Sequence, residues 1–397
     1  MPTLKRRKKR VMKRTIKLAL LACLILLVSA LTLTGCNNSV SPPTNTSPNV
    51  GAQTTPSVSA QSAPDGENQT TPEVTRPDET SLAETTPEVT TPEVAPPKET
   101  PQVNNPFIIE GNTLKGLTDY GKTLTEIIIP LEWNGKKITS IGSSAFFYCQ
   151  KLEKVAISDS IHSIGSMAFE YCSNLKSVVI GEGVINIGNY AFKDCKALTS
   201  IHFNAKNCAD IKYYETRVFE LAGRNGDGIT VTIGKNVERI PANLFRPYMK
   251  EDWANIKTVT FEENSQCRSI GSYAFYRCQN LSTVTLGDSI TVIEEWAFSD
   301  CGITQLKITD SVVSIKKHAF ALCNNLQHLE MGESLSLIEP YAFSCNNLTS
   351  VVFKNTDRWV YTESETSTHC TMIPNLQYPE VAATYLSSTY RWCYWLS

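Results

Sequence analysis

The sequence repeats an Ala-Phe pair at an almost constant interval of 22 or 23 residues, and a Cys follows each Phe two or three positions later. A short alternation of apolar and polar residues follows, such as LKSVVI from Leu175. A fixed period in the twenties is typical of a solenoid, in which each repeat forms one coil. Seven copies carry the pattern, at Phe146, Phe169, Phe192, Phe275, Phe298, Phe320 and Phe343.

Each coil combines a short strand with a compact return path. The alternation predicts a strand whose apolar residues point to one side. The Ile-x-x-Ile and Ala-Phe-x-x-Cys segments suit a turn, or a single turn of helix or 3₁₀ helix. About six buried apolar side chains contribute on the order of 10–15 kcal/mol, and ordering some 23 residues costs at least as much. One coil alone does not fold, whereas stacked coils share their apolar faces.

The repeat resembles the BspA-like leucine-rich repeats of bacterial surface proteins, with the pattern Ile-Gly-x-x-Ala-Phe-x-x-Cys-x-x-Leu-x-x-Val-x-Ile over about 107–397. This resemblance implies a leucine-rich-repeat solenoid: a β-rich, right-handed coil with one short parallel strand per repeat. It places N-terminal capping strands at 107–137, leucine-rich repeats at 138–353 with irregular longer repeats at 204–255, and a C-terminal aromatic cap at 354–397. The rings expected to seal the last coil are Trp359, Tyr390, Trp392, Tyr394 and Trp395.

On each predicted strand, the residues between the apolar ones point away from the core and together form one broad face. Small polar residues dominate this face, without a strong charge bias. An ordinary solvated sheet surface and an extended binding surface both remain open as interpretations. The candidate binding face comprises Lys154, Ser177, Ser200, His202, Thr258, Thr260, Thr283, Thr285, Gln305, Lys307, His328 and Glu330.

The cysteines fall into two groups. Seven follow the Ala-Phe pairs, and we expect them to be small, apolar core residues with reduced thiols. Disulfides between neighbouring coils are the alternative, but stacked side chains place Cβ atoms wider than the roughly 3.8 Å that a bridge prefers. Four others lie off this column and are better candidates for pairing, with partners that the sequence does not assign: Cys208, Cys267, Cys370 and Cys393.

The N-terminal 35 residues have the form of an export signal. A basic segment, Lys5 to Arg14, precedes an apolar run that ends in Leu33-Thr34-Gly35-Cys36. These four residues resemble the lipobox of bacterial lipoproteins, which implies that Cys36 is lipidated and becomes the new N-terminus. The run is nearly long enough to span a bilayer, so an uncleaved membrane anchor is the alternative.

Residues 36–106 are predicted to form a disordered linker behind the lipidated cysteine. They contain no aromatic residue and are rich in Pro, Thr and Glu, so they bury too little apolar surface to offset chain entropy. The overall charge of −2 includes nine Lys and Arg in the first 35 residues, where there is no acid. The remaining chain is strongly acidic, which argues against nucleic acid as a partner.

No catalytic signature accompanies the repeats. The sequence lacks G-x-S-x-G, H-E-x-x-H, Walker and G-x-G-x-x-G patterns, and the adjacent His369-Cys370 has no second ligand pair. We therefore expect no enzymatic activity, cofactor or metal. The resemblance implies a lipid-anchored protein at the bacterial membrane or cell surface that binds another protein, as an adhesin to host or bacterial partners. A glycan- or cell-wall-binding scaffold is the alternative.

Overall fold

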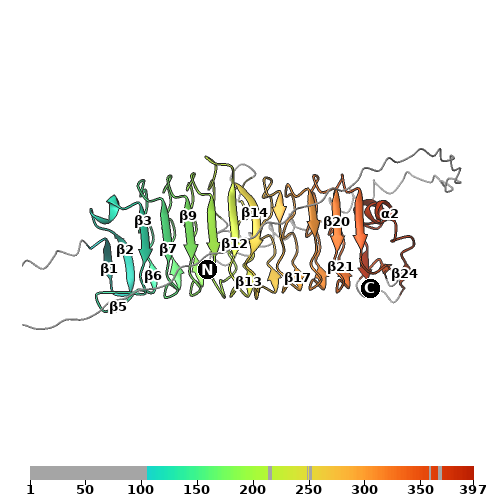
Figure 1. Ribbon diagram of the computed structural model, residues 1–397, viewed down its shortest axis with the longest axis horizontal. Helices are drawn as coiled ribbons and strands as arrows, with labels where there is room; N and C mark the ends of the chain where they lie inside the picture. Colours follow the sequence, from blue (N-terminus) through green and yellow to red (C-terminus); the bar gives the residue numbers. More distant parts are fainter. Residues whose placement is uncertain (1–104, 213–216, 248, 250–252, 357–358, 365–368) are drawn as a thin grey trace, which may run out of the picture. The chain divides into compact units, whose positions relative to one another are not determined.

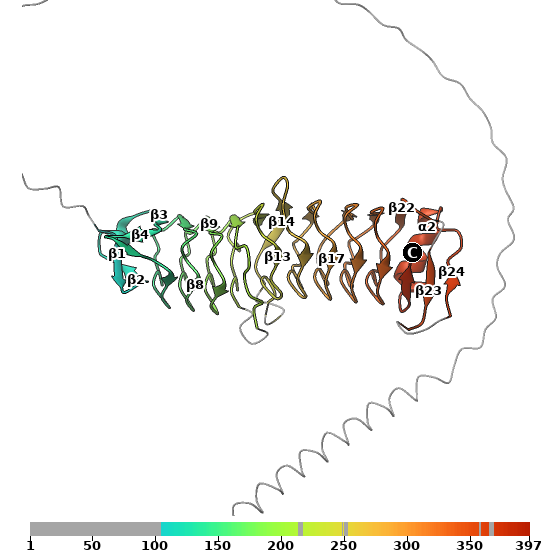
Figure 2. The same cartoon turned by 90° about the horizontal axis from the view of Figure 1, so that it is seen from below.

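The computed structural model describes residues 105–212, 217–247, 249, 253–356, 359–364 and 369–397. These residues form coils that follow one another in a single row, from β1 at one end to the C-terminal elements at the other (Figures 1 and 2). The leucine-rich-repeat solenoid expected from the sequence is confirmed. The predicted signal peptide, the lipobox and nearly all of the predicted linker lie outside the described residues.

The longer strands form the main face of the solenoid. Successive strands pair in parallel because each coil enters the sheet in the same direction. Seven strands form one sheet: β3 (Glu126–Ile129), β7 (Lys154–Ile157), β9 (Ser177–Ile180), β11 (Ser200–Phe203), β12 (Ile229–Ile233), β14 (Ile256–Phe261) and β16 (Thr283–Val284). A separate three-stranded sheet continues the face with β18 (Gln305–Lys307), β20 (His328–Met331) and β22 (Ser350–Phe353).

Regular coils contain a second, two-residue strand, whereas the sequence predicted only one strand per repeat. This strand holds the Ile that precedes the Gly or its equivalent, and the neighbouring coils pair with it in parallel. The first group is β6 (Ser140–Ile141), β8 (Ser163–Ile164) and β10 (Asn186–Ile187). The second group is β13 (Arg239–Ile240), β15 (Ser269–Ile270), β17 (Val292–Ile293), β19 (Ser314–Ile315) and β21 (Leu337–Ile338).

The return paths of the regular coils are turns rather than the single helical turns that the sequence also allowed. Hydrogen bonds between coils hold these turns, for example from the Phe146 amide to the Ala168 carbonyl (2.7 Å) and from Phe169 to Ala191 (2.7 Å). In most coils the residue directly before Ala has a positive φ, as Trp296 (59°) and His318 (58°) do. A side chain in this left-handed conformation costs about 1 kcal/mol or more, so coil stacking must impose it.

The Phe rings form a continuous stack through the core. Phe169 lies between Phe146 and Phe192, with ring centroids 4.6 and 5.1 Å away. The irregular repeats at 204–255 do not interrupt this stack, because Phe219 and Phe245 replace the Ala-Phe rings at spacings of 5.0 Å. The longer repeats instead interrupt the sheet of short strands, which is divided between β10 and β13.

Antiparallel strands close both ends of the solenoid. At the N-terminus, β1 (Phe107–Glu110) pairs with β2 (Thr113–Leu117), which in turn pairs with β6. A 3₁₀ turn η1 (Gly121–Thr123) and the hairpin of β4 (Glu132–Trp133) and β5 (Lys136–Lys137) complete this end. Although β3 falls within the predicted cap, it is already the first strand of the seven-stranded sheet.

At the C-terminus, β25 (Tyr394–Leu396) pairs with β21 and with β23 (Val360–Thr362), which also pairs with β24 (Thr371–Met372). The helix α2 (Pro379–Thr384) packs against β22 and continues into a π-helical turn η3 (Tyr385–Thr389). Trp359 and Trp395 are buried as predicted, and Tyr390 is partly buried against the core. Trp392 was predicted to seal the last coil but is 42% exposed, so this residue does not belong to the sealed core.

Candidate binding face and groove

The outward residues of the main strands lie in two columns, because the parallel strands pair in register. The twelve candidate residues all lie on the side of these strands opposite the buried residues. One column includes Lys154, Ser177, Ser200, Thr258, Thr283, Gln305 and His328. The other includes His202, Thr260, Thr285, Lys307 and Glu330.

Sequence reasoning missed several members of these columns. Thr230 and Thr232 on β12 fill the positions between Ser200 or His202 and the threonines of β14. The alternation of apolar residues and threonines in Ile229–Ile233 is typical of such a strand. The irregular repeat spacing on both sides hid the alignment of this strand with its neighbours. Ile128 and Val352 lie on the same face and are 76% and 46% exposed, so the face also presents apolar side chains.

Ion pairs connect neighbouring coils on the N-terminal part of the face. Lys154 Nζ lies 2.5 Å from Glu126 Oε1, and this carboxylate raises the pKa of Lys154 above its usual value. Near these strands, Lys176 Nζ lies 2.7 Å from Glu153 Oε2. Farther along, His202 Nε2 lies 2.9 Å from Glu262 Oε1. These polar residues already have partners within the protein.

The main face is divided between β16 and β18. At the regular coils, the residue before each strand donates its backbone N–H to the preceding coil, as Thr199 does to Lys176 (2.9 Å) and Gln327 to Thr304 (3.0 Å). Throughout the described part of the chain, no equivalent bond joins Thr304 to Ser282, and β16 and β18 share no ladder. The two strand edges therefore face each other without the ladder of backbone hydrogen bonds that joins neighbouring strands within each sheet.

A one-residue deletion accompanies this division. Cys278 is followed by two residues before Leu281, whereas only Gly302 separates Cys301 from Ile303. A Cβ at Gly302 would lie 2.2 Å from the Gln279 carbonyl oxygen, so the shortened connection requires glycine. The turn that leads into β18 is therefore tighter than in its neighbours.

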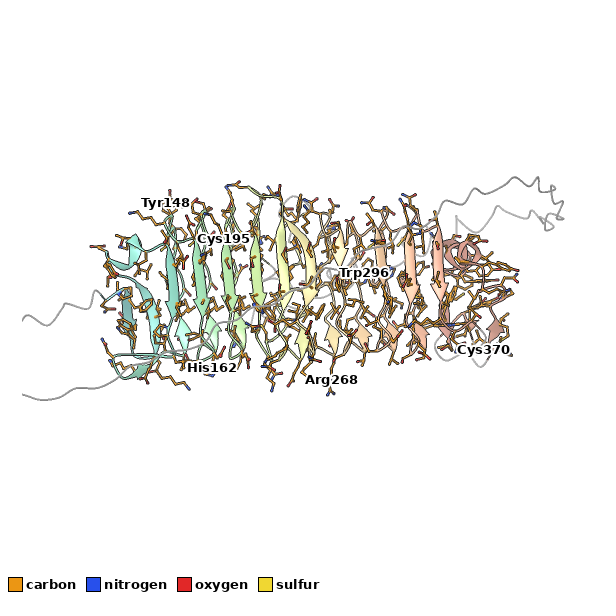
Figure 3. All side chains as sticks on the ribbon, in the orientation of Figure 1. Tyr148, His162, Cys195, Arg268, Trp296 and Cys370 are labelled. Carbon is orange, nitrogen blue, oxygen red and sulfur yellow. The ribbon has the colours of Figure 1, made fainter. Side chains whose placement is uncertain are left out.

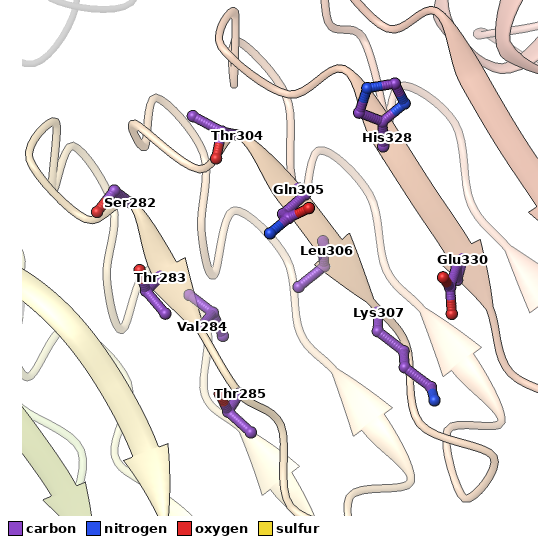
Figure 4. A pocket seen from close by; sticks show the side chains of 10 residues that line it. All are labelled: Ser282, Thr283, Val284, Thr285, Thr304, Gln305, Leu306, Lys307, His328 and Glu330. Carbon is purple, nitrogen blue, oxygen red and sulfur yellow. The ribbon is translucent and has the colours of Figure 1, made fainter. Parts of the chain in front are cut away.

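A polar groove of about 300 Å³ lies over the division (Figure 4). Its sides are formed by β16, β18 and the outward residues of β20, and the Gln305 carboxamide leans from β18 toward β16. Val284 and Leu306 lie behind it and are 8% and 3% exposed. The groove thus brings six of the twelve candidate residues together: Thr283, Thr285, Gln305, Lys307, His328 and Glu330.

A row of stacked rings crosses the return paths and was not predicted. Trp296 lies 6.0 Å from Tyr273 and 4.0 Å from His318, and His318 lies 5.0 Å from Tyr341. Burial, and secondly the charge of Lys317, lower the pKa of His318 below its usual value. Both faces of the Trp296 and His318 rings are covered by neighbouring rings, so neither offers an open face to a ligand.

The seven cysteines that follow the Ala-Phe pairs, called the ladder cysteines below, recur because each position makes the same contact between coils. Each buried Sγ–H donates to the Phe carbonyl of the preceding coil, as from Cys172 to Phe146 (3.0 Å) and from Cys323 to Phe298 (3.1 Å). Cysteine therefore supplies both a small apolar volume and a weak donor. Cys149, in the first of the repeats with this motif, is only partly buried. The neighbouring Cys172 side chain, and secondly Lys122, lower the pKa of the Cys149 thiol below its usual value.

The four cysteines off the ladder do not pair in the structure, contrary to the expectation from the sequence. All eleven described cysteines are free. Burial raises the pKa of Cys208 and of Cys267 to about 12, and that of Cys393 to about 11. Three of these four thiols thus fill apolar space in separate parts of the solenoid, and Cys370 is exposed. Sequence spacing could not reveal this, because none of the four follows an Ala-Phe pair, so the repeat pattern does not assign them to the core.

The described residues contain no group of His, Cys, Asp and Glu side chains that could hold a metal ion. Within the same residues, no helix has the length and apolar character needed to cross a membrane.

Figure 3 shows Tyr148 at one rim of the solenoid, with His162 and Arg268 at the opposite rim. The predicted lipobox, Leu33 to Cys36, lies outside the described residues.

The family model for the BspA type leucine rich repeat region matches residues 119–250 and 248–373. The chain therefore belongs to the BspA-type leucine-rich-repeat family, whose members are typically bacterial cell-surface proteins. Leucine-rich-repeat proteins are generally non-enzymatic binding scaffolds, and no catalytic family is indicated. A search of the curated proteins gives no match.

Several solved structures are similar to this chain. A leucine-rich-repeat protein of T. pallidum is 21% identical, with a TM-score of 0.28, over 59% of this chain and 82% of that chain. A leucine-rich cell-surface protein of Faecalibacterium prausnitzii is 19% identical, with a TM-score of 0.23, over 63% and 93% of the two chains. A leucine-rich-repeat protein of Eubacterium ventriosum is 19% identical, with a TM-score of 0.30, over 62% and 72%.

Proposed function

We propose that this protein is exported, anchored to the bacterial membrane through a lipid on Cys36, and uses the strand face of its solenoid to bind another protein. The partner is a host or bacterial surface protein, which makes the chain an adhesin. The observation that carries this proposal is an apolar column at the N-terminal part of the face, which begins with an exposed isoleucine and continues with two partly buried residues. Ile128, 76% exposed, is in register with Ala156 and Val179 on the next two strands.

The surroundings of this column resemble those of a protein interface. The ion pairs Lys154–Glu126 and Lys176–Glu153 lie close to it on the same strands or at their starts. Protein interfaces commonly place apolar residues at the centre and charged residues at a solvated rim. An exposed aliphatic side chain of this kind is a suitable anchor for a partner, because burying it removes apolar surface from water.

Immobilised host matrix proteins and bacterial surface proteins provide the binding test, with residues 105–397 as the soluble partner. Ile128→Glu should weaken capture by at least about tenfold, because binding would desolvate the new carboxylate. Ile108→Glu is the matched control, since Ile108 is 46% exposed but lies on β1 at the N-terminal end. Equal binding by the native chain and the Ile128 variant would exclude the proposed contact.

Lipid anchoring is tested separately by metabolic labelling with a fatty acid. Cys36→Ala should abolish incorporation, because the thiol that receives the lipid is removed. Cys149→Ala is the control, since Cys149 lies in the first of the seven motif repeats and should not affect the label. Persistence of the label in the Cys36 variant would refute the lipoprotein assignment.

A further inference from the structure

The groove between β16 and β18 differs from the preceding part of the face in the surroundings of its ionisable side chains. On that part, Lys154 Nζ and His202 Nε2 lie 2.5 and 2.9 Å from carboxylate oxygens. Among the described residues, the side chains of Gln305, Lys307 and Glu330 make no hydrogen bond or ion pair with the protein. The same holds for Thr283, Thr285 and His328, so every polar group here remains available to a ligand.

The backbone adds further hydrogen-bonding capacity. Because β16 and β18 share no ladder, their facing N–H and C=O groups do not form the regular pairs of bonds that join neighbouring strands within each sheet. Backbone polar groups in a protein are nearly always paired with protein, water or ligand. The groove therefore holds either exchangeable water or the polar groups of a bound molecule, at a place where both donors and acceptors are offered.

An added β-strand does not fit between the two edges. A strand inserted as a new rung needs about 4.8 Å on each side. The coils behind the groove remain at normal spacing, with Phe298 5.1 Å from Phe275 and 5.3 Å from Phe320. A ligand must instead lie across the face and reach into the groove with small polar groups.

The lining also lacks the apolar anchor that a protein partner normally uses. Energetically important protein contacts favour large aromatic or aliphatic side chains in desolvated pockets, whereas Val284 and Leu306 are almost entirely covered. The charged side chains are one cation, Lys307, and one anion, Glu330, so the groove favours neither ligand charge. Sugar hydroxyls are small, uncharged, and both donate and accept hydrogen bonds, which matches this lining.

We propose that the groove between β16 and β18 is a binding subsite for a neutral, hydroxyl-rich saccharide. Gln305 and Lys307 donate to sugar hydroxyls, Glu330 accepts from them, and the threonine hydroxyls of β16 do both. This site is separate from the apolar column around Ile128. The saccharide proposal therefore does not depend on the proposed protein binding and can fail without affecting it.

Electrophoresis of the native chain through gels that contain an α-glucan, a β-glucan, a mannan or a galactan provides the test. At least one of these four neutral polysaccharides should retard the protein. The double change Gln305→Ala/Glu330→Ala should weaken that retardation by at least about tenfold, since two hydrogen-bonding groups are lost. The single change Thr304→Val should weaken it less while preserving the shape of the groove.

The matched control is Ser177→Ala/Ser200→Ala, which removes two outward side chains from β9 and β11 and should leave retardation unchanged. Thermal melting should show that all variants fold like the native chain. The saccharide proposal is overturned by retardation in none of the four gels, by undiminished retardation of the groove variant, or by equal loss in the control. A groove variant that loses only protein binding would assign the groove to a polypeptide and also overturn it.

Discussion

At the scale of single residues, the Cys of each repeat meets two requirements at once. The position is buried in the apolar core and faces the Phe carbonyl of the preceding coil, as Cys345 faces Phe320 at 3.1 Å. Burial raises the pKa of Cys345 to about 12 and also holds Cys195 well above the usual thiol range. Such thiols stay protonated at neutral pH, and the thiolate is the form that reacts.

Thiol reactivity provides a prediction at this scale. In residues 105–397, a thiol reagent at neutral pH should react quickly only with Cys149 and Cys370, the two cysteines that are not buried. Cys149 should be the faster, because Cys172 and Lys122 lower its pKa. Mass spectrometry of the labelled protein checks this, with all eleven thiols becoming reactive in denaturant. A disulfide between Cys149 and Cys172 in the isolated protein would contradict it.

At the scale of the structural element, one coil is stabilised by its two neighbours as well as by the hydrogen bonds within its own turns. Its strand, its turn and its Phe ring each interact with the preceding and the following coil, as Phe169 does through its ring and its backbone N–H. In the regular coils the return path is stabilised by hydrogen bonds between coils. A local change should therefore weaken one region of the solenoid first.

Phe169→Ala tests this dependence on neighbours. The ring is fully buried between two others, so its loss should reduce the free energy of unfolding by about 3–5 kcal/mol and divide the unfolding transition. Thr283→Ala, on the outward side of β16, should change the free energy by less than about 0.5 kcal/mol. Thermal and urea melts of the two variants provide the comparison. Similar losses in both would show that the assignment of the inner and outer sides is wrong.

At the scale of the whole molecule, the solenoid depends on its closed ends. A stack of parallel coils leaves an open apolar end and an unpaired strand edge unless something covers them. Here β25 pairs with the edge of β21, while Trp395 stacks over Phe353 at 6.2 Å and contacts Trp359. The C-terminal aromatic segment thus protects the last coils from solvent.

Trp395→Ala should destabilise the C-terminal end selectively. The side chain is 1% exposed, so its removal should cost about 3–5 kcal/mol locally. Hydrogen exchange should accelerate in β21 and β22 while β7 and β9 keep their protection. Trp392→Ala is the control, because this ring is 42% exposed and its loss should cost less than about 0.5 kcal/mol. Uniform acceleration along the solenoid would indicate that the cap does not act locally.

The repeat pattern alone was enough to predict the coil, its core and the outward side of the strands. The regular spacing of Phe169, Phe192 and their equivalents predicts one coil per repeat. The alternation of apolar and polar residues along each strand predicts which side chains point inward and which point outward. It also indicated that Trp359 and Trp395 pack against the last coil, and both are buried. These features depend on local sequence pattern and composition, so they can be predicted without knowing which distant residues are in contact.

The contacts between neighbouring coils could not be predicted from the sequence, because they depend on how the coils stack. The second strand, the left-handed residue before Ala and the thiol bond to a Phe carbonyl all depend on the adjacent coil. The groove has the same origin, because the division between β16 and β18 exists only between stacked coils. Sequence alternation assigns a side chain to a face, but the pairing of that face with its neighbours is a property of three-dimensional packing.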